Sequence, residues 1–313
     1  MFKRIYASIA LKYSDSSTDD LSFGLLLEKG IHKALQQRDF DVFEQIMSDL
    51  SAHDLSLAVE GLAHSEELNA PLRSFIDHPN SELARLLGGR VNIITAWEKR
   101  TGTVAEEVGE DQWLGFQHYL NLAEECLDYK WTKSSYQLLA LSDRITVCRG
   151  FSDKDLAKSL LQESMKLDNE FVPSLMSYFK VISPKWLGCE EELLRFCTES
   201  AVPVRPLLQA MFLAEVFSDL YFDNTETAKV KFKRAYLGQY REWSEQWDLQ
   251  FRNTVTQIYF YNYSILLAHV LGFKKEEKVG ISKLRGYYTQ APWGYFGMEN
   301  KKQVELFLKG RFL

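Results

Sequence analysis

Cysteine is scarce in this chain, and its spacing fits neither metal binding nor cross-linking. Only four cysteines occur among the 313 residues, namely Cys126, Cys148, Cys189 and Cys197. No two of them form a C-x-x-C pair, so a zinc ribbon is not indicated, and they are too few for a dense disulfide framework. The scarcity of cysteine therefore favours a reducing compartment.

Long apolar runs and an excess of positive charge are also missing. No stretch approaches the roughly 20 apolar residues of a membrane span, and the short, interrupted run in Met1–Lys12 is too weak for a signal peptide. The formal net charge of -6 argues against nonspecific nucleic-acid binding, which requires clustered lysine and arginine. We therefore expect a soluble cytoplasmic protein with neither a nucleic-acid nor a membrane partner.

The sequence motifs of common enzymes are absent as well. The chain contains no G-x-x-x-x-G-K-[ST], H-E-x-x-H, G-x-S-x-G or G-x-G-x-x-G motif. Its six histidines show no i, i+4 pairing with one another that would place two ligands on one helix face. We therefore identify no catalytic residue, no metal ligand and no cofactor site, and predict that the protein is not an enzyme.

What the sequence does contain is a helical spacing of apolar residues. Trp113, Phe116, Leu120, Ala123 and Leu127 follow one another at intervals of three, four, three and four, which places all five side chains on one face of an α-helix. Comparable stripes recur from about residue 20 to the C-terminus, without a convincing strand pattern between them. This periodicity predicts an all-α protein.

One internal spacing suggests that the helices repeat. Ala123-x-x-x-Leu127 and Ala157-x-x-x-Leu161 lie 34 positions apart, which is the tetratricopeptide period. Two alanines at that distance arise more often by chance than by repetition, and the full W-x-x-L-G-x-x-Y pattern is absent. We predict antiparallel helix pairs stacked as a tetratricopeptide-like α-solenoid. Prolines near residue 200 mark a boundary between two helical arrays, residues 1–200 and 201–313, and we expect the second array to be continuous with the first.

Aromatic residues near the C-terminus are the candidate partner-binding residues, because tyrosine and tryptophan dominate binding hot spots. Most of them lie in a loop-like, glycine-containing run that begins at residue 285. The predicted residues are Trp243, Trp247, Tyr287, Tyr288, Trp293, Tyr295 and Phe296. The alternative, which we favour for the loop, is that these rings fold back and cap the last hydrophobic layer.

Three segments carry a resemblance to a known family. Ala96–Gly102 reads A-W-E-K-R-T-G, Glu110–Trp113 opens a W-x-x-F helix, and Pro184–Cys189 reads P-K-W-L-G-C. They resemble the A-W-x-x-R-G, x-x-x-W-x-x-F and P-R-W-G-G-S patterns of a bacterial family of tetratricopeptide-like helical proteins, domain of unknown function 4034. The resemblance covers about residues 80–200, with differences at Lys185, Leu187 and Cys189. It implies a bacterial all-α protein but no activity.

These observations favour an interaction protein over an enzyme. Our leading hypothesis is an immunity protein that binds and neutralises a bacterial toxin, because an acidic helical array can steer and occlude a basic toxin domain. The expected partner is another protein, such as a toxin or effector domain encoded nearby. The alternative is a general peptide-binding scaffold or adaptor. A third hypothesis is an enzyme whose active site is assembled from residues far apart in the sequence.

Overall fold

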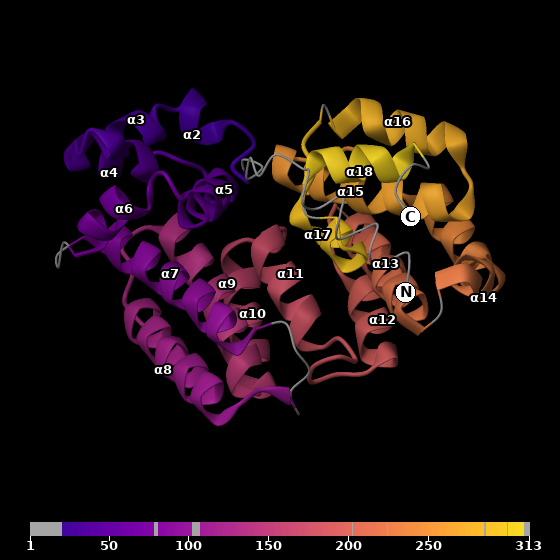
Figure 1. Ribbon diagram of the computed structural model, residues 1–313, viewed down its shortest axis with the longest axis horizontal. Helices are drawn as coiled ribbons and strands as arrows, with labels where there is room; N and C mark the ends of the chain where they lie inside the picture. The colour runs from indigo at the N-terminus through magenta and orange to yellow at the C-terminus, as the bar shows by residue number, and fades with distance from the viewer. Residues whose placement is uncertain are drawn as a thin grey trace. The chain divides into compact units, whose positions relative to one another are not determined.

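The structure of the chain, a computed structural model, is built from α-helices (Figure 1). It describes residues 21–77, 81–101, 107–201, 203–223, 225–284, 286–298 and 300–309. No strand occurs in these ranges, so the prediction of an all-α fold is confirmed for them. No helix in the same ranges is both long enough and apolar enough to cross a membrane.

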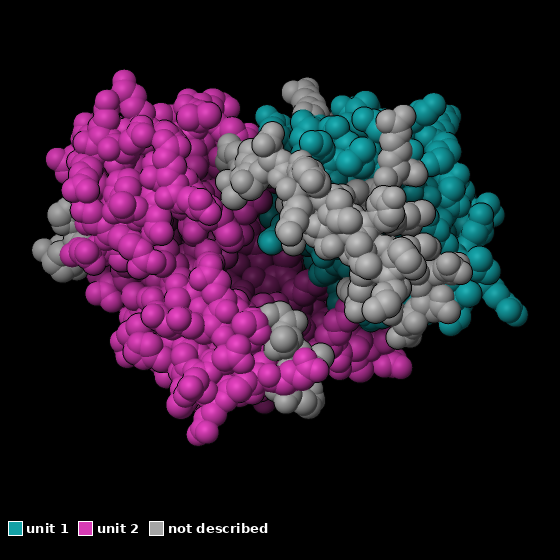
Figure 2. Space-filling model, in the orientation of Figure 1, with its two compact units in different colours: residues 1–19, 197–313 teal, residues 20–196 magenta. Residues whose placement is uncertain are grey.

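The chain divides into two compact units, which Figure 2 shows in different colours. Unit 2 comprises residues 20–196, and unit 1 comprises residues 1–19 and 197–313. The helices that lie in unit 2 or reach its end are α2 (Leu25–Glu28), α3 (Ile31–Gln36), α4 (Phe40–Ser48), α5 (Ala52–Ala63), α6 (Asn69–Ile76), α7 (Glu82–Arg100), α8 (Glu110–Leu127), α9 (Ser134–Phe151), α10 (Lys154–Leu167), α11 (Val172–Val181) and α12 (Glu190–Glu199).

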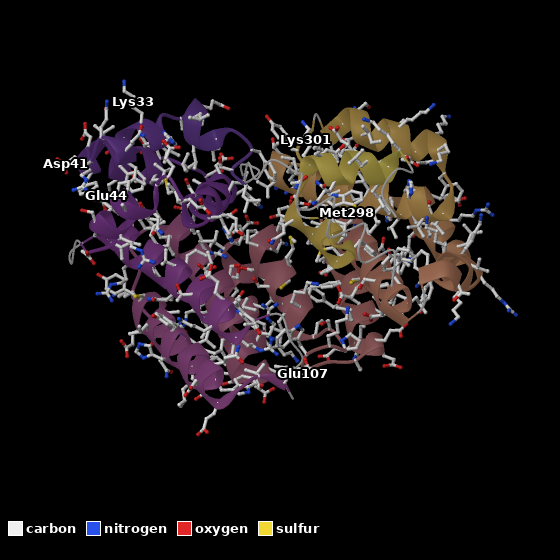
Figure 3. All side chains as sticks on the ribbon, in the orientation of Figure 1. Lys33, Asp41, Glu44, Glu107, Met298 and Lys301 are labelled. Carbon is white, nitrogen blue, oxygen red and sulfur yellow. The ribbon has the colours of Figure 1, made fainter. Side chains whose placement is uncertain are left out.

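Helix α8 shows how the apolar spacing produces packing in unit 2. Phe116, Leu120, Ala123 and Leu127 are buried, as the stripe predicts, and Trp113 at the start of the stripe is half-buried. The face that these residues form packs against α7 and α9, and α9 in turn packs against α10 and α11. Charged side chains outside such faces, for example Lys33 and Asp41, point away from the ribbon (Figure 3).

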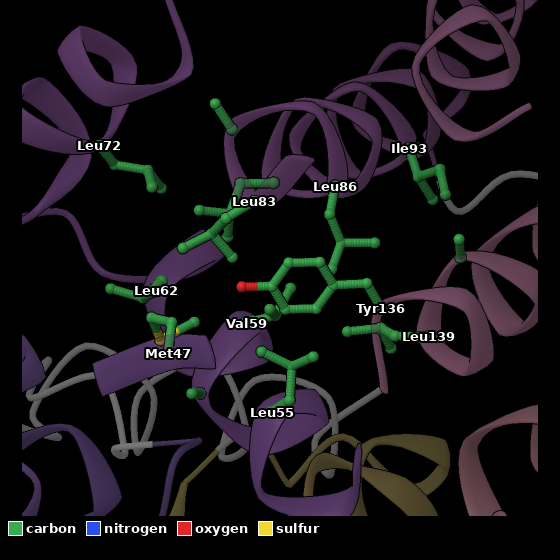
Figure 4. Packing of buried hydrophobic residues seen from close by; sticks show 14 of the residues in the cluster. Met47, Leu55, Val59, Leu62, Leu72, Leu83, Leu86, Ile93, Tyr136 and Leu139 are labelled. Atoms are coloured by element: carbon green, nitrogen blue, oxygen red, sulfur yellow. The ribbon is translucent and has the colours of Figure 1, made fainter. Parts of the chain in front are cut away.

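The core of unit 2 is dominated by aliphatic side chains from α5, α7 and α9. Leu55, Val59, Leu86 and Leu139 surround the ring of Tyr136, which is fully buried (Figure 4). The Tyr136 hydroxyl has no hydrogen-bond partner, and its burial, followed by nearby carboxylates, raises the pKa of Tyr136 far above its ordinary value. The ring therefore contributes to this core through its apolar surface.

Unit 1 is organised around one apolar helix, α15. Thirteen of its 18 residues are buried, so no side of the helix is polar, which is the signature of a helix enclosed by others. It packs against α13, α14, α16 and α17. The helices of unit 1 after α12 are α13 (Arg205–Asp223), α14 (Thr225–Gln246), α15 (Thr254–Leu271), α16 (Lys274–Leu284), α17 (Gln290–Trp293), the 3-10 helix η2 (Gly294–Phe296) and α18 (Lys301–Leu308).

Candidate functional site

Helix packing in unit 2 brings together three tryptophans that lie far apart in the sequence. Trp97 lies near the C-terminal end of α7, Trp113 lies in the first turns of α8, and Trp186 lies between α11 and α12. The ring centroids of Trp97 and Trp186 are 5.3 Å apart in an edge-to-face contact. With Arg100 and Arg149 they form what we call the tryptophan–arginine cluster. Its three rings are those of the segments that resemble the bacterial family.

Arg149 lies between two of these rings. Its guanidinium carbon is 4.5 Å from the centroid of Trp97 and 4.8 Å from that of Trp186, distances typical of cation–π contacts. The side chain makes no hydrogen bond or ion pair with any described residue, and its Nε is buried. Burial, and secondly the charge of Arg100, lowers the pKa of Arg149 to about 10. The group therefore stays positively charged at neutral pH, at an energetic cost.

Arg100 adds a second cation to the cluster. Its guanidinium carbon lies 5.7, 5.6 and 5.5 Å from the ring centroids of Trp97, Trp113 and Trp186 respectively. Nη1 donates a hydrogen bond to the carbonyl oxygen of Thr101 at 3.4 Å. All five side chains of the cluster are half-buried. The cluster is therefore a partly exposed feature of unit 2 in which two cations face three aromatic rings.

A tight turn places Trp186 in the cluster. The Trp186 amide donates to the carbonyl oxygen of Ser183 at 2.9 Å, and the Leu187 amide donates to that of Val181 at 2.9 Å. The chain then passes so close to α11 that a Cβ on Gly188 would clash with the carbonyl oxygen of Ile182. Glycine is thus required at this position, because only a residue without a side chain allows such an approach.

Trp97 supplies a buried donor without an acceptor. Its indole Nε1 is enclosed and makes no hydrogen bond, although buried indole N–H groups normally find a partner. Arg149 Nε, beside the same ring, is also buried without a hydrogen-bond acceptor. The cluster therefore contains two unpaired donors and positive charge, but no acceptor. A group that brings oxygen acceptors and negative charge would match it chemically.

Unit 1 contains a second candidate site, an apolar pocket of about 510 Å³ between α14, α15 and α16. We call it the α14–α16 pocket. Its apolar walls are Tyr240, Trp247, Leu249, Phe260, Phe273 and Val279. The Tyr240 and Phe273 rings stack with centroids 5.5 Å apart, and Trp247 meets Phe260 edge to face at 5.2 Å. Leu249 and Val279 are 44% and 49% exposed, so apolar surface reaches the solvent here.

Hydrogen bonding and charge shape the pocket further. Trp247 Nε1 donates to Gln209 Oε1 at 2.7 Å, which fixes the indole ring against the wall. Arg241, Glu245, Lys275 and Glu276 also line the pocket, so charges of both signs surround its apolar part. Burial, and secondly Glu276, raises the pKa of Tyr240 to about 12. The Tyr240 hydroxyl therefore stays neutral at physiological pH.

The predicted partner-binding residues occupy different environments. Trp243, Tyr288 and Trp293 are buried, and Trp293 has no exposed surface. Trp247 lines the α14–α16 pocket. Tyr287 is 39% exposed. In this structure, therefore, the three buried rings act as core residues, whereas Trp247 and Tyr287 present surface.

The remaining two predicted residues, Tyr295 and Phe296, are half-buried. Phe296 packs against Phe217 and Tyr221 on α13, with centroid distances of 5.5 and 5.0 Å. The seven predicted residues thus do not converge on one site. Partner binding through the exposed ones stays a prediction.

No group of three or more His, Cys, Asp or Glu side chains in the described ranges is arranged to hold a metal ion. Comparisons of the chain with protein-family models, with curated proteins and with solved structures found no match. The resemblance to the bacterial helical family therefore stays a prediction that rests on the three sequence segments. Function must be inferred from the geometry of the two candidate sites.

Proposed function

We propose that this chain is a protein-binding module and that its α14–α16 pocket receives an apolar side chain of the partner. The observation that carries the proposal is the exposed apolar surface of Leu249 and Val279 above aromatic walls. Large apolar side chains that fill such pockets are typical anchors of protein interfaces. Burying one leucine-sized side chain stabilises a complex by about 1.5–3 kcal/mol.

The charges around the pocket suit a protein partner better than an apolar small molecule. Arg241, Lys275, Glu245 and Glu276 line the pocket together with its apolar walls. Charged rims of mixed sign orient a macromolecular partner and exclude wrong ones, while the apolar centre supplies most of the affinity. We therefore expect the partner to place an apolar side chain in the pocket and charged side chains around it.

The most specific form of the proposal is an immunity protein that neutralises a bacterial toxin in the cytoplasm. In this form the helices pair as tetratricopeptide-like repeats, and the net charge of -6 supports rapid association with a basic toxin domain. A general peptide-binding scaffold is the other form. It would bind many peptides with micromolar dissociation constants, whereas neutralisation requires one partner and a much smaller constant.

Co-expression with the products of neighbouring genes tests the proposal. We expect one of them to be toxic when expressed alone, to form a complex with this protein, and to lose its toxicity in that complex. The variant Val279→Glu places a charge at the pocket and is expected to weaken the complex at least about tenfold, because a charge is costly to bury in an apolar contact.

A matched control separates the pocket from the rest of unit 1. Val230 is also an exposed helical valine, at 69%, but it lies on α14 outside the pocket lining. Val230→Glu should bind and protect as the unchanged protein does. The proposal fails if no neighbouring product is bound, or if Val279→Glu and Val230→Glu have equal effects on binding.

A further inference from the structure

We propose that the tryptophan–arginine cluster of unit 2 is a binding site for an oxyanion, the carboxylate or phosphate group of a small aromatic ligand, with Arg149 as its main contact. This site lies in the other unit from the α14–α16 pocket and takes a different class of ligand. The inference therefore goes beyond the proposed protein-binding function and does not depend on it.

The charge of Arg149 is unmatched among the described residues. Arg144, five residues earlier on the same helix, shows how this protein pairs an arginine. Its guanidinium is 2.5 Å from Glu124 Oε1 and 3.1 Å from Asp128 Oδ1. No described carboxylate lies within ion-pair distance of Arg149, and the charge that lowers its pKa is another cation, Arg100. A half-buried charge without a counter-ion is costly unless a ligand supplies one.

The cluster also presents a set of hydrogen-bond donors. Arg149 Nε and Trp97 Nε1 are buried without an acceptor. The two terminal nitrogens of Arg149 also make no hydrogen bond, but they are not among the enclosed atoms. They therefore reach solvent. A guanidinium whose terminal nitrogens are unpaired and not enclosed can bind carboxylate or phosphate through two parallel hydrogen bonds.

The guanidinium of Arg149 is already held in place. Trp97 and Trp186 pack against it at 4.5 and 4.8 Å, and the turn at Gly188 fixes Trp186. An arginine restrained in this way loses little conformational entropy when an anion binds. The exposed parts of Trp113 and Trp186 offer apolar ring surface beside the charge. This combination favours a ligand in which the oxyanion is attached to a flat aromatic group.

The helix ends at the cluster do not cancel its charge. Arg100 and Arg149 both lie in the last turn of their helices, α7 and α9. Each helix C-terminus contributes about -0.5 charge, against a full positive charge on the Arg149 guanidinium. A purely structural role, in which Arg149 only complements the helix end and stacks on the rings, remains the competing explanation. The experiment below distinguishes the two roles.

Isothermal titration calorimetry of the full chain tests the site with four defined probes at constant ionic strength. Benzoate and phenyl phosphate carry an oxyanion on an aromatic ring, phenol lacks the anion, and inorganic phosphate lacks the ring. We expect saturable binding of benzoate or phenyl phosphate, weaker binding of inorganic phosphate, and no binding of phenol. The stronger of the two aromatic anions identifies the site as one for carboxylate or for phosphate.

Variants of the two arginines on α9 assign the binding to Arg149. Arg149→Met should lower the affinity for the aromatic anion by about 10- to 100-fold, the loss expected for charge-assisted hydrogen bonds. Arg144→Met removes a paired arginine and should leave the affinity unchanged. Arg149→Lys keeps the charge but not the planar fork, and should bind with intermediate affinity. It also replaces Arg149→Met if that variant does not fold.

Two results would overturn the proposal. One is that neither benzoate nor phenyl phosphate binds the unchanged protein saturably. The other is that the Arg149 variants bind these anions as tightly as the unchanged protein does. A failure of toxin or peptide binding at the α14–α16 pocket would leave these titrations unaffected, so the two proposals fail separately.

Discussion

Two buried indole N–H groups, one in each unit, have opposite environments. In unit 1, Trp293 Nε1 donates to Asn262 Oδ1 at 2.7 Å. In unit 2, Trp97 Nε1 has no acceptor among the described residues, and it lies beside Arg149, which has no counter-ion among them. The contrast separates polar groups that hold the fold together from polar groups that are available for a ligand.

The Trp293 environment is fully satisfied. Asn262 is completely buried on α15, and its Nδ2 donates to the carbonyl oxygens of Ile258 at 2.9 Å and Tyr287 at 3.0 Å. Its Oδ1 also accepts from the Thr289 amide at 3.2 Å. One side chain thus ties α15 to the segment 286–298. Such a network is rigid and strongly stabilising because every member is paired.

Hydrogen bonding separates structural aromatic residues from ligand-binding ones in this helical protein. Both tryptophans are surrounded by rings, and both belong to segments that the sequence marks as unusual. Only their hydrogen bonds distinguish them. Where every donor has an acceptor, as at Asn262, the polar groups need no ligand. Where only donors and positive charge are present, as at Arg149, an external acceptor completes the chemistry.

The largest expected effect comes from breaking the balanced network. Asn262→Leu would leave the Thr289 amide, the Trp293 indole N–H and the Tyr287 carbonyl oxygen without this partner. Each loss costs about 1–3 kcal/mol, so we expect the free energy of unfolding to fall by about 4 kcal/mol. Urea-induced unfolding measures the change, and amide hydrogen exchange should show loss of protection in the segment 286–298.

Asn121→Leu on α8 is the control for this prediction, because Asn121 is exposed and takes part in no described hydrogen bond. Its effect should stay within about 0.5 kcal/mol. Equal effects of the two substitutions would show that the Asn262 network does not hold the C-terminal segment.

A buried carboxyl group provides a case between the two extremes. Asp143 Oδ1 lies 2.6 Å from Arg90, which also contacts Glu60 at 3.3 Å, but Asp143 Oδ2 has no partner. Burial raises the pKa of Asp143 to about 6, against the opposing effect of Arg90. The ordinary pKa of an aspartate in an unfolded chain is about 4. Between pH about 4 and about 6, therefore, the folded protein keeps a proton on Asp143 that the unfolded chain releases.

The sign of the pH dependence follows from this raised pKa. The contribution of Asp143 to stability is fully present below pH about 4 and is lost as the pH rises through about 6. Two pKa units correspond to about 3 kcal/mol at most. Urea unfolding measured between pH 4 and 7 should therefore show a declining contribution that Asp143→Asn removes. An unchanged pH profile in that variant would contradict the assignment.

The smallest effects are expected for substitutions of the two arginines on α9, which should change the free energy of unfolding in opposite directions. Arg144→Met would leave Glu124 and Asp128 without their cation, and should lower the free energy of unfolding by about 2 kcal/mol. Arg149→Met removes an unpaired charge while keeping an apolar stem against the rings, and should raise it by about 1 kcal/mol. Thermal or urea unfolding checks both. A destabilised Arg149→Met variant would favour a structural role for Arg149.

The fold class was predictable because helical periodicity is a local property. The spacing from Trp113 to Leu127 identifies both the helix and its buried face, and the structure buries four of the five residues. The C-terminal aromatic segment was less predictable, since capping and partner binding require the same residue types. Trp293 can be buried because its indole N–H finds an acceptor in Asn262, and Asn262 lies 31 positions earlier in the sequence. The sequence of the loop alone does not contain that contact.

The tryptophan–arginine cluster was missed for a related reason. An arginine in the last turn of a helix, such as Arg149, normally complements the helix dipole. Its lack of a counter-ion depends on the tertiary packing of α7, α9 and the Trp186 turn, which no spacing reveals. A signal was nevertheless present, because Trp97, Arg100, Trp113 and Trp186 all belong to the segments that resemble one family. If these segments are interpreted as parts of one binding site and not as a family signature, they identify four of the five residues of the tryptophan–arginine cluster.

The apolar character of α15 has a consequence for incomplete copies of this protein. Because the helix has no hydrophilic side, only neighbouring segments can shield it from water. A nascent or proteolysed chain that stops after α16 would lack α17, which packs on α15 and carries Trp293, and would also lack Phe307, whose ring contacts that of Trp293. Such a product would display an adhesive surface to chaperones and degradation enzymes. Helix α17 and Phe307 thus cover apolar surface of α15 that would otherwise contact water.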